Sequence, residues 1–399
     1  MSLAELYPFV DGTSAALGEV APASVYIGLG RAAKKRRVSA AVRTAVDAGR
    51  VDEEWDAFVG TAPGGSYLQT SRWGQVKAHN GWAAERIKVY EDGQLIGGCQ
   101  LLLRSYAGVA AVGYVTRGPL FYSQRTDVRG VLLDALERYA RRRRLMHLKV
   151  QPPGTGPDVV PELTARRFVE GTLPPGPLAT TRIDLRRDPD DLLADAARST
   201  RHGIRAAARR GVVIRPGTEA DLPFFSAAVR STARRQGFLP YPASYYERMW
   251  RIFGEDGLAH LLVAEHDGVP LSAQLLLAYN DTVTAKMIGW SGARSDLHPN
   301  RALDWASIQW ARAQNHRWYD FDGIDLWVAR SVLNGVTPPR LPGPQRYKLS
   351  FGGEVVVFPA PMDRTARLFA AALRRMERSL HGKRLARRLG GRQRSEGPP

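Results

Sequence analysis

Four basic side chains recur at helical spacing in the middle of the chain. Arg198, His202, Arg205 and Arg209 are separated by four, three and four residues, so they share one face of an α-helix. The helix is expected to run from the Asp-Pro pair at residues 188–189 to Gly211. The same positive surface includes Arg201 and Arg210. Arg binds phosphates through paired hydrogen bonds, so the pattern predicts phosphate contact; a solvated helix face is the alternative.

Two further cations stand where a ligand could reach them. Arg117-Gly118-Pro119 follows an apolar strand at residues 112–115. This order places the Arg117 guanidinium at the margin of a sheet; the alternative is that Arg117 only caps a turn. Lys348 lies between the aromatic residues Tyr347 and Phe351. Away from water such a Lys stabilises an oxyanion strongly; the alternative is a surface Lys on an edge strand.

The motifs of covalent and metal catalysis are missing from the sequence. It contains no Gly-x-Ser-x-Gly, no His-Glu-x-x-His and no P-loop. Cys99 lies within an expected strand beside glycines, which favours a buried structural thiol over a nucleophile. We therefore expect no metal and no cofactor, and a reaction that depends on positioning and charge stabilisation.

An internal repeat indicates the elements that hold these residues. Residues 87–103 and 262–277 each predict a β-hairpin, with Asp92-Gly93 and Asp267-Gly268 at the two turns. An Asp-Gly pair supplies the positive φ that a two-residue hairpin needs. Each hairpin precedes a helix, opening at residue 132 or 302, and then a strand at residues 146–150 or 318–322. This order predicts two similar α/β domains with mixed sheets.

Composition divides the chain into four segments. Pro- and Gly-rich stretches at residues 152–157 and 173–177 bracket the change of domain, and residues 181–185 read as the first strand after it. The expected segments are an unassigned N-terminal extension (1–48), a first domain (49–178), a second domain (179–360), and a basic C-terminal helix and tail (361–399) that packs on the first domain.

Bulk charge favours anionic partners. The 399 residues include 57 Lys or Arg against 39 Asp or Glu, a net charge of +18, which attracts polyanions. Residues 361–399 alone hold eleven basic and three acidic residues, so an RNA backbone, an anionic membrane surface or solvent could face this helix. A single Cys and the lack of a long apolar stretch or a secretory signal point to the cytoplasm.

Ordered motifs along most of the chain resemble those of a known family. Gln69, Trp73 and Lys77 form a Gln-x-x-x-Trp-x-x-x-Lys pattern within residues 66–77. The later motifs are Arg117-Gly118-Pro119, residues 209–212, Asp221-Leu222, Gly237-Phe238, and residues 298–305, 319–323 and 346–353. Together, over residues 50–360, they resemble the FemABX family of tRNA-dependent peptidoglycan bridge aminoacyltransferases, in its compact FemX-like branch.

The resemblance implies a fold, a reaction and a site. The fold would be two tandem acetyltransferase-like (GNAT-like) domains, α/β in class with mixed sheets. In the reaction, an amine of a UDP-linked or lipid-linked muropeptide attacks the ester of aminoacyl-tRNA, in the cytoplasm or at the inner face of an anionic membrane. That ester is already activated, so the enzyme aligns the reactants and stabilises a tetrahedral oxyanion.

By the same resemblance, Lys348 would stabilise the oxyanion. The acceptor would be bound by Lys77, Arg117, Arg205 and Trp290, and the tRNA phosphates by Arg198, Arg201, Arg209 and Arg210.

One departure from the family pattern concerns the acceptor. Residues 287–290 read Met-Ile-Gly-Trp where the family often has a site tyrosine. Three alternatives stay open: a tRNA-dependent enzyme of peptide-like natural product assembly, a CoA-dependent N-acetyltransferase, and a non-catalytic RNA- or membrane-binding protein. The second would need a Gly-rich pyrophosphate turn, for which we find no convincing instance.

Overall fold

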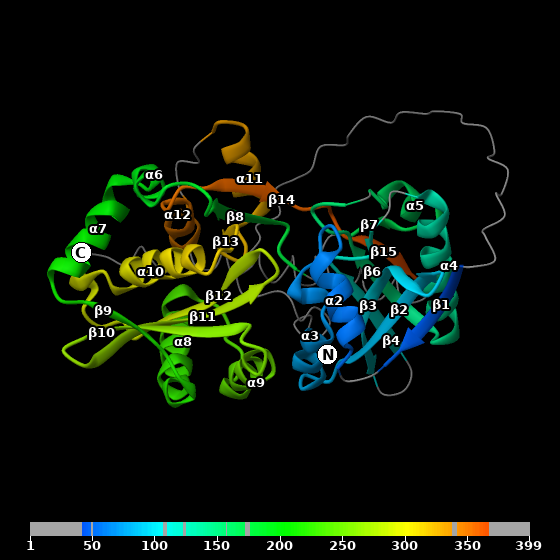
Figure 1. The fold of residues 1–399 in the computed structure, drawn as a ribbon, viewed down its shortest axis with the longest axis horizontal. Coiled ribbons are helices and arrows are strands. Elements are labelled where there is room, and N and C mark those ends of the chain that lie inside the picture. The colour runs from blue at the N-terminus through cyan, green and yellow to red at the C-terminus, as the bar shows by residue number, and fades with distance from the viewer. Residues whose placement is uncertain are drawn as a thin grey trace, which may run out of the picture.

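The chain folds around two mixed β-sheets that lie side by side (Figure 1). The computed structural model describes residues 42–48, 51–106, 110–122, 125–156, 158–171, 176–336 and 341–366. Within these ranges, no helix combines the length and the apolar character needed to cross a bilayer.

The first sheet has the order β1-β2-β3-β4-β6-β15-β7, with the short β5 paired to β3. Only the β4–β6 pair is parallel; the other pairs are antiparallel. The strands are β1 (Val42–Asp47), β2 (Ala83–Glu91), β3 (Gln94–Tyr106), β4 (Ala110–Thr116), β5 (Leu120–Phe121), β6 (Leu145–Gln151), β7 (Val169–Glu170) and β15 (Met362–Thr365).

Short capped helices precede the first sheet's main hairpin. Asp52 caps α2 (Glu53–Thr61) by accepting from the Trp55 amide, and Thr70 caps α3 (Ser71–Ala78) by accepting from the Trp73 amide. The 3₁₀ turn η1 (Tyr67–Gln69) joins α2 to α3. Two later helices, α4 (Thr126–Arg142) and α5 (Val160–Ala165), contribute Leu132 and Leu163 to one apolar core with β2, β3 and β6.

The second sheet has the order β14-β8-β13-β12-β11-β10-β9. Its strands are β8 (Ala179–Asp184), β9 (Val213–Pro216), β10 (Ala259–His266), β11 (Val269–Tyr279), β12 (Thr282–Trp290), β13 (Trp318–Asp320) and β14 (Glu354–Val357). Its helices are α6 (Pro189–Asp195), α7 (Arg198–Arg209), α8 (Leu222–Gln236), α9 (Ala243–Gly254), α10 (Pro299–Ala313), α11 (Leu326–Leu333) and α12 (Gly343–Leu349), with 3₁₀ turns η2 (Glu219–Asp221) and η3 (Ser295–Leu297).

The predicted repeat is confirmed, and the two copies exchange a strand. Both Asp-Gly turns have positive φ at both positions, as a two-residue hairpin requires. Strand by strand, β1-β2-β3-β4-β6-β15-β7 corresponds to β9-β10-β11-β12-β13-β8-β14. The strand beside β6, however, is β15, which follows the whole second sheet in sequence, so the chain crosses between the sheets twice.

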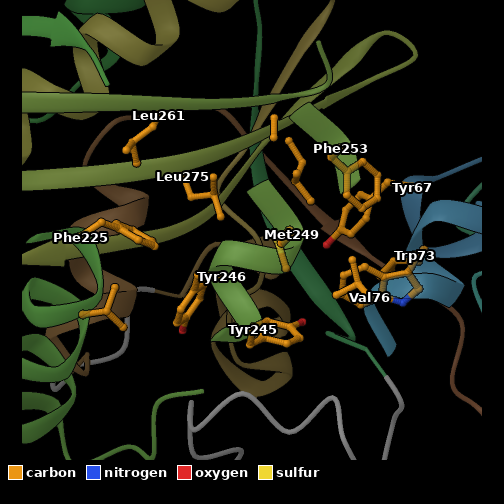
Figure 2. Close-up of a cluster of buried hydrophobic side chains, with 14 of the residues drawn as sticks. Tyr67, Trp73, Val76, Phe225, Tyr245, Tyr246, Met249, Phe253, Leu261 and Leu275 are labelled. Atoms are coloured by element: carbon orange, nitrogen blue, oxygen red, sulfur yellow. The ribbon is translucent and has the colours of Figure 1, made fainter. Parts of the chain in front are cut away.

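One apolar core joins the two halves (Figure 2). Helices α3 and α9 pack together there, with Trp73 and Val76 on α3 facing Tyr245 and Met249 on α9. Phe253 lies edge-on to Tyr67, with ring centroids 6.3 Å apart. Because both halves contribute to this core, we expect their relative orientation to be fixed.

Polar contacts reinforce this interface. Arg72 bonds both Asp56 on α2 and Asp256 just after α9, so one guanidinium bridges the two halves. The Tyr279 hydroxyl donates to the main-chain oxygen of Asp56 at 2.9 Å.

Four sequence-based expectations on element boundaries need correction. Residues 42–47, assigned to the extension, form β1 because they pair with β2. Residues 362–365, expected to begin a helix, pair with β6 and β7 as β15; the remainder of the predicted C-terminal helix, from residue 367, lies outside the described residues. The single basic helix is two helices, since the chain is extended at Ala196 and Ala197 between α6 and α7. Lys348 lies on a helix, α12, rather than on an edge strand.

Candidate active site between the two sheets

The parallel strands β12 and β13 pair over three residues and then separate. Their register joins residues 282–284 to residues 318–320, after which β12 continues to Trp290. The chain after β13 turns sharply, with φ of 53° at Asp322 and 96° at Gly323. The opening lies at the carboxyl end of β13, where ligands bind in open α/β sheets.

A β-bulge directs a cation to this opening. Along β11 and β12, Leu275 pairs with Met287 and Leu276 with Ala285, so Lys286 is the extra residue. Bulges of this kind re-aim a side chain. The Lys286 Nζ lies 2.7 Å from Asp322 Oδ2, and both side chains are largely buried.

Asp320, the last residue of β13, is held by two donors on one oxygen. Its Oδ1 accepts from Thr180 Oγ1 at 2.5 Å and from the Asp322 amide at 2.7 Å. Burial, together with the neighbouring Asp322 carboxylate, raises the pKa of Asp320 above its ordinary value. Asp320 is thus a fixed carboxylate with increased proton affinity.

Lys348 lies against the turn that follows β13. Its Nζ donates to the main-chain oxygens of Gly323 at 2.7 Å and Asp322 at 3.2 Å. An ammonium has three donors, so one remains for another acceptor. Burial lowers the pKa of Lys348, while the Asp322, Asp320 and Asp304 carboxylates oppose that shift.

A buried network fixes the helix that carries Lys348. Asp304 on α10 accepts from the hydroxyl of Tyr347 at 2.5 Å, from that of Tyr319 at 3.0 Å and from Gln274 Nε2 at 2.7 Å. Burial raises the pKa of Asp304. Because Tyr347 precedes Lys348, this network sets the position of α12 against α10.

Arg117 approaches the same region from the first sheet. It follows β4 with φ of 57°, is 6% exposed, and stacks on Phe358 with 3.3 Å from Cζ to the ring centroid. Its Nη2 donates to the Pro177 main-chain oxygen at 2.6 Å, and its Nη1 has no hydrogen-bond partner within the described part of the chain. Burial lowers the pKa of Arg117 to about 9, against the opposing effect of Asp320 and other neighbours.

A cavity of about 570 Å³ connects these groups. Its walls include Arg117 from the first half and Asp320, Asp322 and Gly323 from the second. Lys348 does not line this cavity; it contacts the inner side of the Asp322-Gly323 turn. The arrangement brings carboxylates, a buried guanidinium and an ammonium to one place between the sheets.

Lys77 lies at an adjoining small cavity of about 20 Å³. Its side chain is 1% exposed, and its Nζ lies 4.6 Å from the Trp73 ring centroid and about as close to two tyrosines of the other half. Lys286 and Asp322 also line this space. Lys77 therefore belongs to the same polar region.

Comparisons with known proteins agree with this architecture. The sequence model of the FemAB family matches residues 51–157, and that of an acetyltransferase (GNAT) domain matches residues 194–349. Lipid II:glycine glycyltransferases of Staphylococcus aureus strains bovine RF122 / ET3-1 and MRSA252 are each 30% identical over 229 residues, covering 54% of this chain and 54% of theirs. The chain is thus similar to the FemAB family over residues 51–157 and to the glycyltransferases over about half of their length.

The solved structure of FemX supports the fold of this chain. It superposes with a TM-score of 0.71 at 22% identity, covering 80% of this chain and 97% of that one. The predicted fold, two tandem GNAT-like domains with mixed sheets, is thereby confirmed. The chain spans about half the length of the curated relatives it matches.

Not all the predicted site residues lie at this cavity. Arg205 is exposed on α7, which lies at the end of the second half farthest from Lys77 on α3 (Figure 1). The predicted partnership of Arg205 with Lys77 is wrong, because α7 packs on α10 and not at the interface. Arg201 bonds the main-chain oxygens of Ala194 and Ala196, and Arg210 bonds that of Asp296; Arg198 and Arg209 are exposed at the two ends of α7.

Trp290 also lies away from the cavity. It ends β12, at the opposite end from the residues that pair with β13. Its indole donates to the Ala293 main-chain oxygen at 2.9 Å and packs under the Arg235 guanidinium. Trp290 therefore does not join the polar region.

Sequence reasoning missed three residues of the site. Asp320 and Asp322 stood within a quoted family motif without a role, and Lys286 was not noticed. The available signal was a lone Lys inside the apolar strand Thr282–Trp290, since a cation is rarely buried unless it is paired. Cys99 is buried, and burial raises the pKa of its thiol, in agreement with the expected structural role.

Proposed function

We propose that this protein transfers an aminoacyl group from aminoacyl-tRNA to an amine of a peptidoglycan precursor. The observation that carries the proposal is the spare donor of Lys348 at the turn beside Asp320 and Asp322. A fixed ammonium next to the bound reactants stabilises the oxyanion of an acyl-transfer intermediate. The similarity to the FemAB family supports the same reaction class, because the matched relatives are named glycyltransferases.

The acceptor in this proposal is anionic and linked to a lipid. The relatives are named for lipid II, and the buried cations Lys77 and Arg117 suit its phosphates or carboxylates. The protein would then work in the cytoplasm at the inner face of the membrane. The net charge of +18 favours contact with an anionic surface there.

The donor tRNA would lie along α7. Arg198, His202 and Arg209 are exposed on this helix, and its first turn contacts the end of α12. The Ala197 amide donates to the Ser350 main-chain oxygen at 2.8 Å, two residues beyond Lys348. A tRNA whose phosphate backbone lies on α7 would therefore have its acylated end near Lys348.

The test uses the full chain with a mixed pool of radiolabelled aminoacyl-tRNAs and lipid-linked or UDP-linked muropeptides. We expect label to enter a muropeptide amide, and ribonuclease treatment before mixing to abolish this transfer. Absence of transfer with every acceptor would overturn the proposal.

A CoA-dependent acetyltransferase is the second candidate. The GNAT-domain match over residues 194–349 is the observation that favours it. The same assay with labelled acetyl-CoA in place of charged tRNA distinguishes the two candidate functions. Transfer that resists ribonuclease and needs acetyl-CoA would support this second candidate.

A further inference from the structure

The proposed acyl transfer needs a proton acceptor. An acceptor amine is mostly an ammonium at neutral pH, because alkyl amines have pKa values near 10, and an ammonium has no lone pair with which to attack an ester. Lys348, which donates to two carbonyl oxygens, is suited to stabilise negative charge and not to remove this proton. Another side chain at the cavity must do so.

Two carboxylates at the end of β13 line the cavity, and their surroundings differ. Asp322 Oδ2 is paired with Lys286 Nζ at 2.7 Å, so this oxygen is already in contact with a cation. Among the described residues, Asp320 forms no such ion pair. Its two hydrogen bonds, from Thr180 and the Asp322 amide, both reach Oδ1.

The Oδ2 atom of Asp320 is therefore the basic atom of the site. It has no hydrogen-bond partner in the described part of the chain, and Asp320 lines the cavity of about 570 Å³ together with Arg117. Arg117 is 6% exposed, and its Nη1 has no hydrogen-bond partner in the described part of the chain. It places a buried cation at the same cavity, which suits an anionic part of a ligand.

We infer that Asp320 is the general base that takes a proton from the acceptor ammonium. The inference rests on the proposed function and assigns a catalytic residue to it. The amine lone pair then forms the N–C bond, and the carbonyl oxygen becomes an oxyanion near Lys348. When the ester C–O bond breaks, the ribose oxygen leaves with the proton held by Asp320. The excess proton on nitrogen passes to Asp320 and on to solvent, so the products are an amide, a free tRNA hydroxyl and one proton.

The chemistry of Asp320 agrees with this role. A general base is most effective when its pKa lies near the working pH, and burial raises the pKa of Asp320 in that direction. Its position is fixed by two hydrogen bonds to the other oxygen, so Oδ2 is presented in one orientation.

The decisive variant is Asp320→Asn. An Asn side chain keeps an oxygen that can accept from Thr180 and from the Asp322 amide, so the fold is preserved while the base is lost. We expect kcat to fall by about 10²–10⁴-fold, with KM for both substrates nearly unchanged. The wild-type kcat should decline only below the pKa of Asp320. In the variant this acid limb should be replaced by a decline that begins at the pKa of the acceptor amine, because only the free amine reacts.

Asp92→Asn is the matched control, because it removes one carboxylate at an exposed hairpin turn where Asn is equally suited to positive φ. It should retain the wild-type kcat and pH profile. The inference is overturned if Asp320→Asn retains a kcat within about threefold of that control, or loses kcat with the acid limb intact. Wild-type protein that transfers nothing from tRNA would instead overturn the proposed function.

Discussion

The two sheets share a strand order, and they differ at the end of their parallel strand pair. In the first sheet, β4 and β6 remain paired from Ala111 and Leu145 to Thr116 and Gln151. In the second, β12 and β13 pair over three residues and separate around Lys286 and Asp322. The first copy is closed and the second is open. The duplication thus leaves one copy closed by its neighbouring strand and the other open at the proposed site.

The neighbouring strand explains why the first sheet stays closed. β15 pairs with β6, and Lys149 on β6, fully buried, contacts Asp363 on β15 at 2.5 and 2.7 Å. A buried ion pair between two strands fixes their register, although each charge loses its hydration. The corresponding strand in the second sheet, β8, instead contributes Thr180, which positions Asp320.

The largest effect should come from breaking the closed end. Lys149→Met leaves the Asp363 carboxylate in a buried site without its cation, which should lower the free energy of unfolding by about 3–5 kcal/mol. Urea unfolding followed by circular dichroism measures the loss. The folded fraction should keep its kcat, since the change lies outside the open site.

The double variant Lys149→Met, Asp363→Leu is the control for this prediction. Replacing both charges by apolar groups is often neutral or stabilising, so the double variant should recover much of the lost stability. If the free energy of unfolding of Lys149→Met lies within about 1 kcal/mol of that of the wild type, this ion pair does not hold the sheet closed.

At the open end, Lys348→Ala should lower kcat by roughly 10²–10³-fold, as the loss of an oxyanion donor does. The affinity for aminoacyl-tRNA should change little, because the proposed partner of Lys348 is the ester carbonyl and not the phosphates. Single-turnover transfer and equilibrium binding measure the two quantities. Arg346→Ala, on an exposed side of the same helix, should behave as wild type; equal losses in both variants would remove Lys348 from the mechanism.

A third prediction concerns pH at the closed end. His147 on β6 is buried, and burial lowers its pKa to about 3. Below the unfolded-state pKa of about 6.5, the unfolded chain takes up a proton that the folded chain does not, so stability is present above that pH and falls as the pH decreases toward 3. His147 should therefore lower the free energy of unfolding by about 2 kcal/mol between pH 7 and pH 5.

Urea unfolding at the two pH values tests this third prediction. His147→Gln should remove the difference attributable to His147, whereas His79→Gln, at an exposed position, should leave it in place. An equal pH dependence in wild type and His147→Gln would contradict the assignment.

The sequence predicted the repeated elements well because their signals are local. Asp92-Gly93 and the apolar strands around it define a hairpin within a few residues. The exchange of β15 could not be predicted, since it depends on pairing between residues more than 200 positions apart. For α12, a local signal existed and was missed: Pro344 stands in the first turn, a preferred helix start.

The candidate site was predicted only in part for a similar reason. Lys77, Arg117 and Lys348 were identified by family motifs, and the structure places them around one region. Lys286 reaches that region through a bulge. The role proposed for Asp320 depends on which of its two oxygens accepts the hydrogen bonds. Both properties arise from tertiary geometry, so residue type and spacing alone do not reveal them. Arg205 illustrates the opposite error, since a shared helix face says nothing about which part of the molecule that helix covers.

The smallest effect is expected on α7, outside the parallel strand pair. Arg198→Gln with Arg209→Gln removes two exposed cations from the proposed tRNA surface, so the slope of log K against log salt should decrease in magnitude by about 1.4–1.8. Filter binding of aminoacyl-tRNA across a salt series measures this slope, with kcat at saturating tRNA unchanged. Arg141→Gln with Arg142→Gln, on exposed positions of α4 in the first half, removes the same charge. If both pairs change the slope equally, the tRNA responds to total charge, and α7 is not a specific tRNA surface.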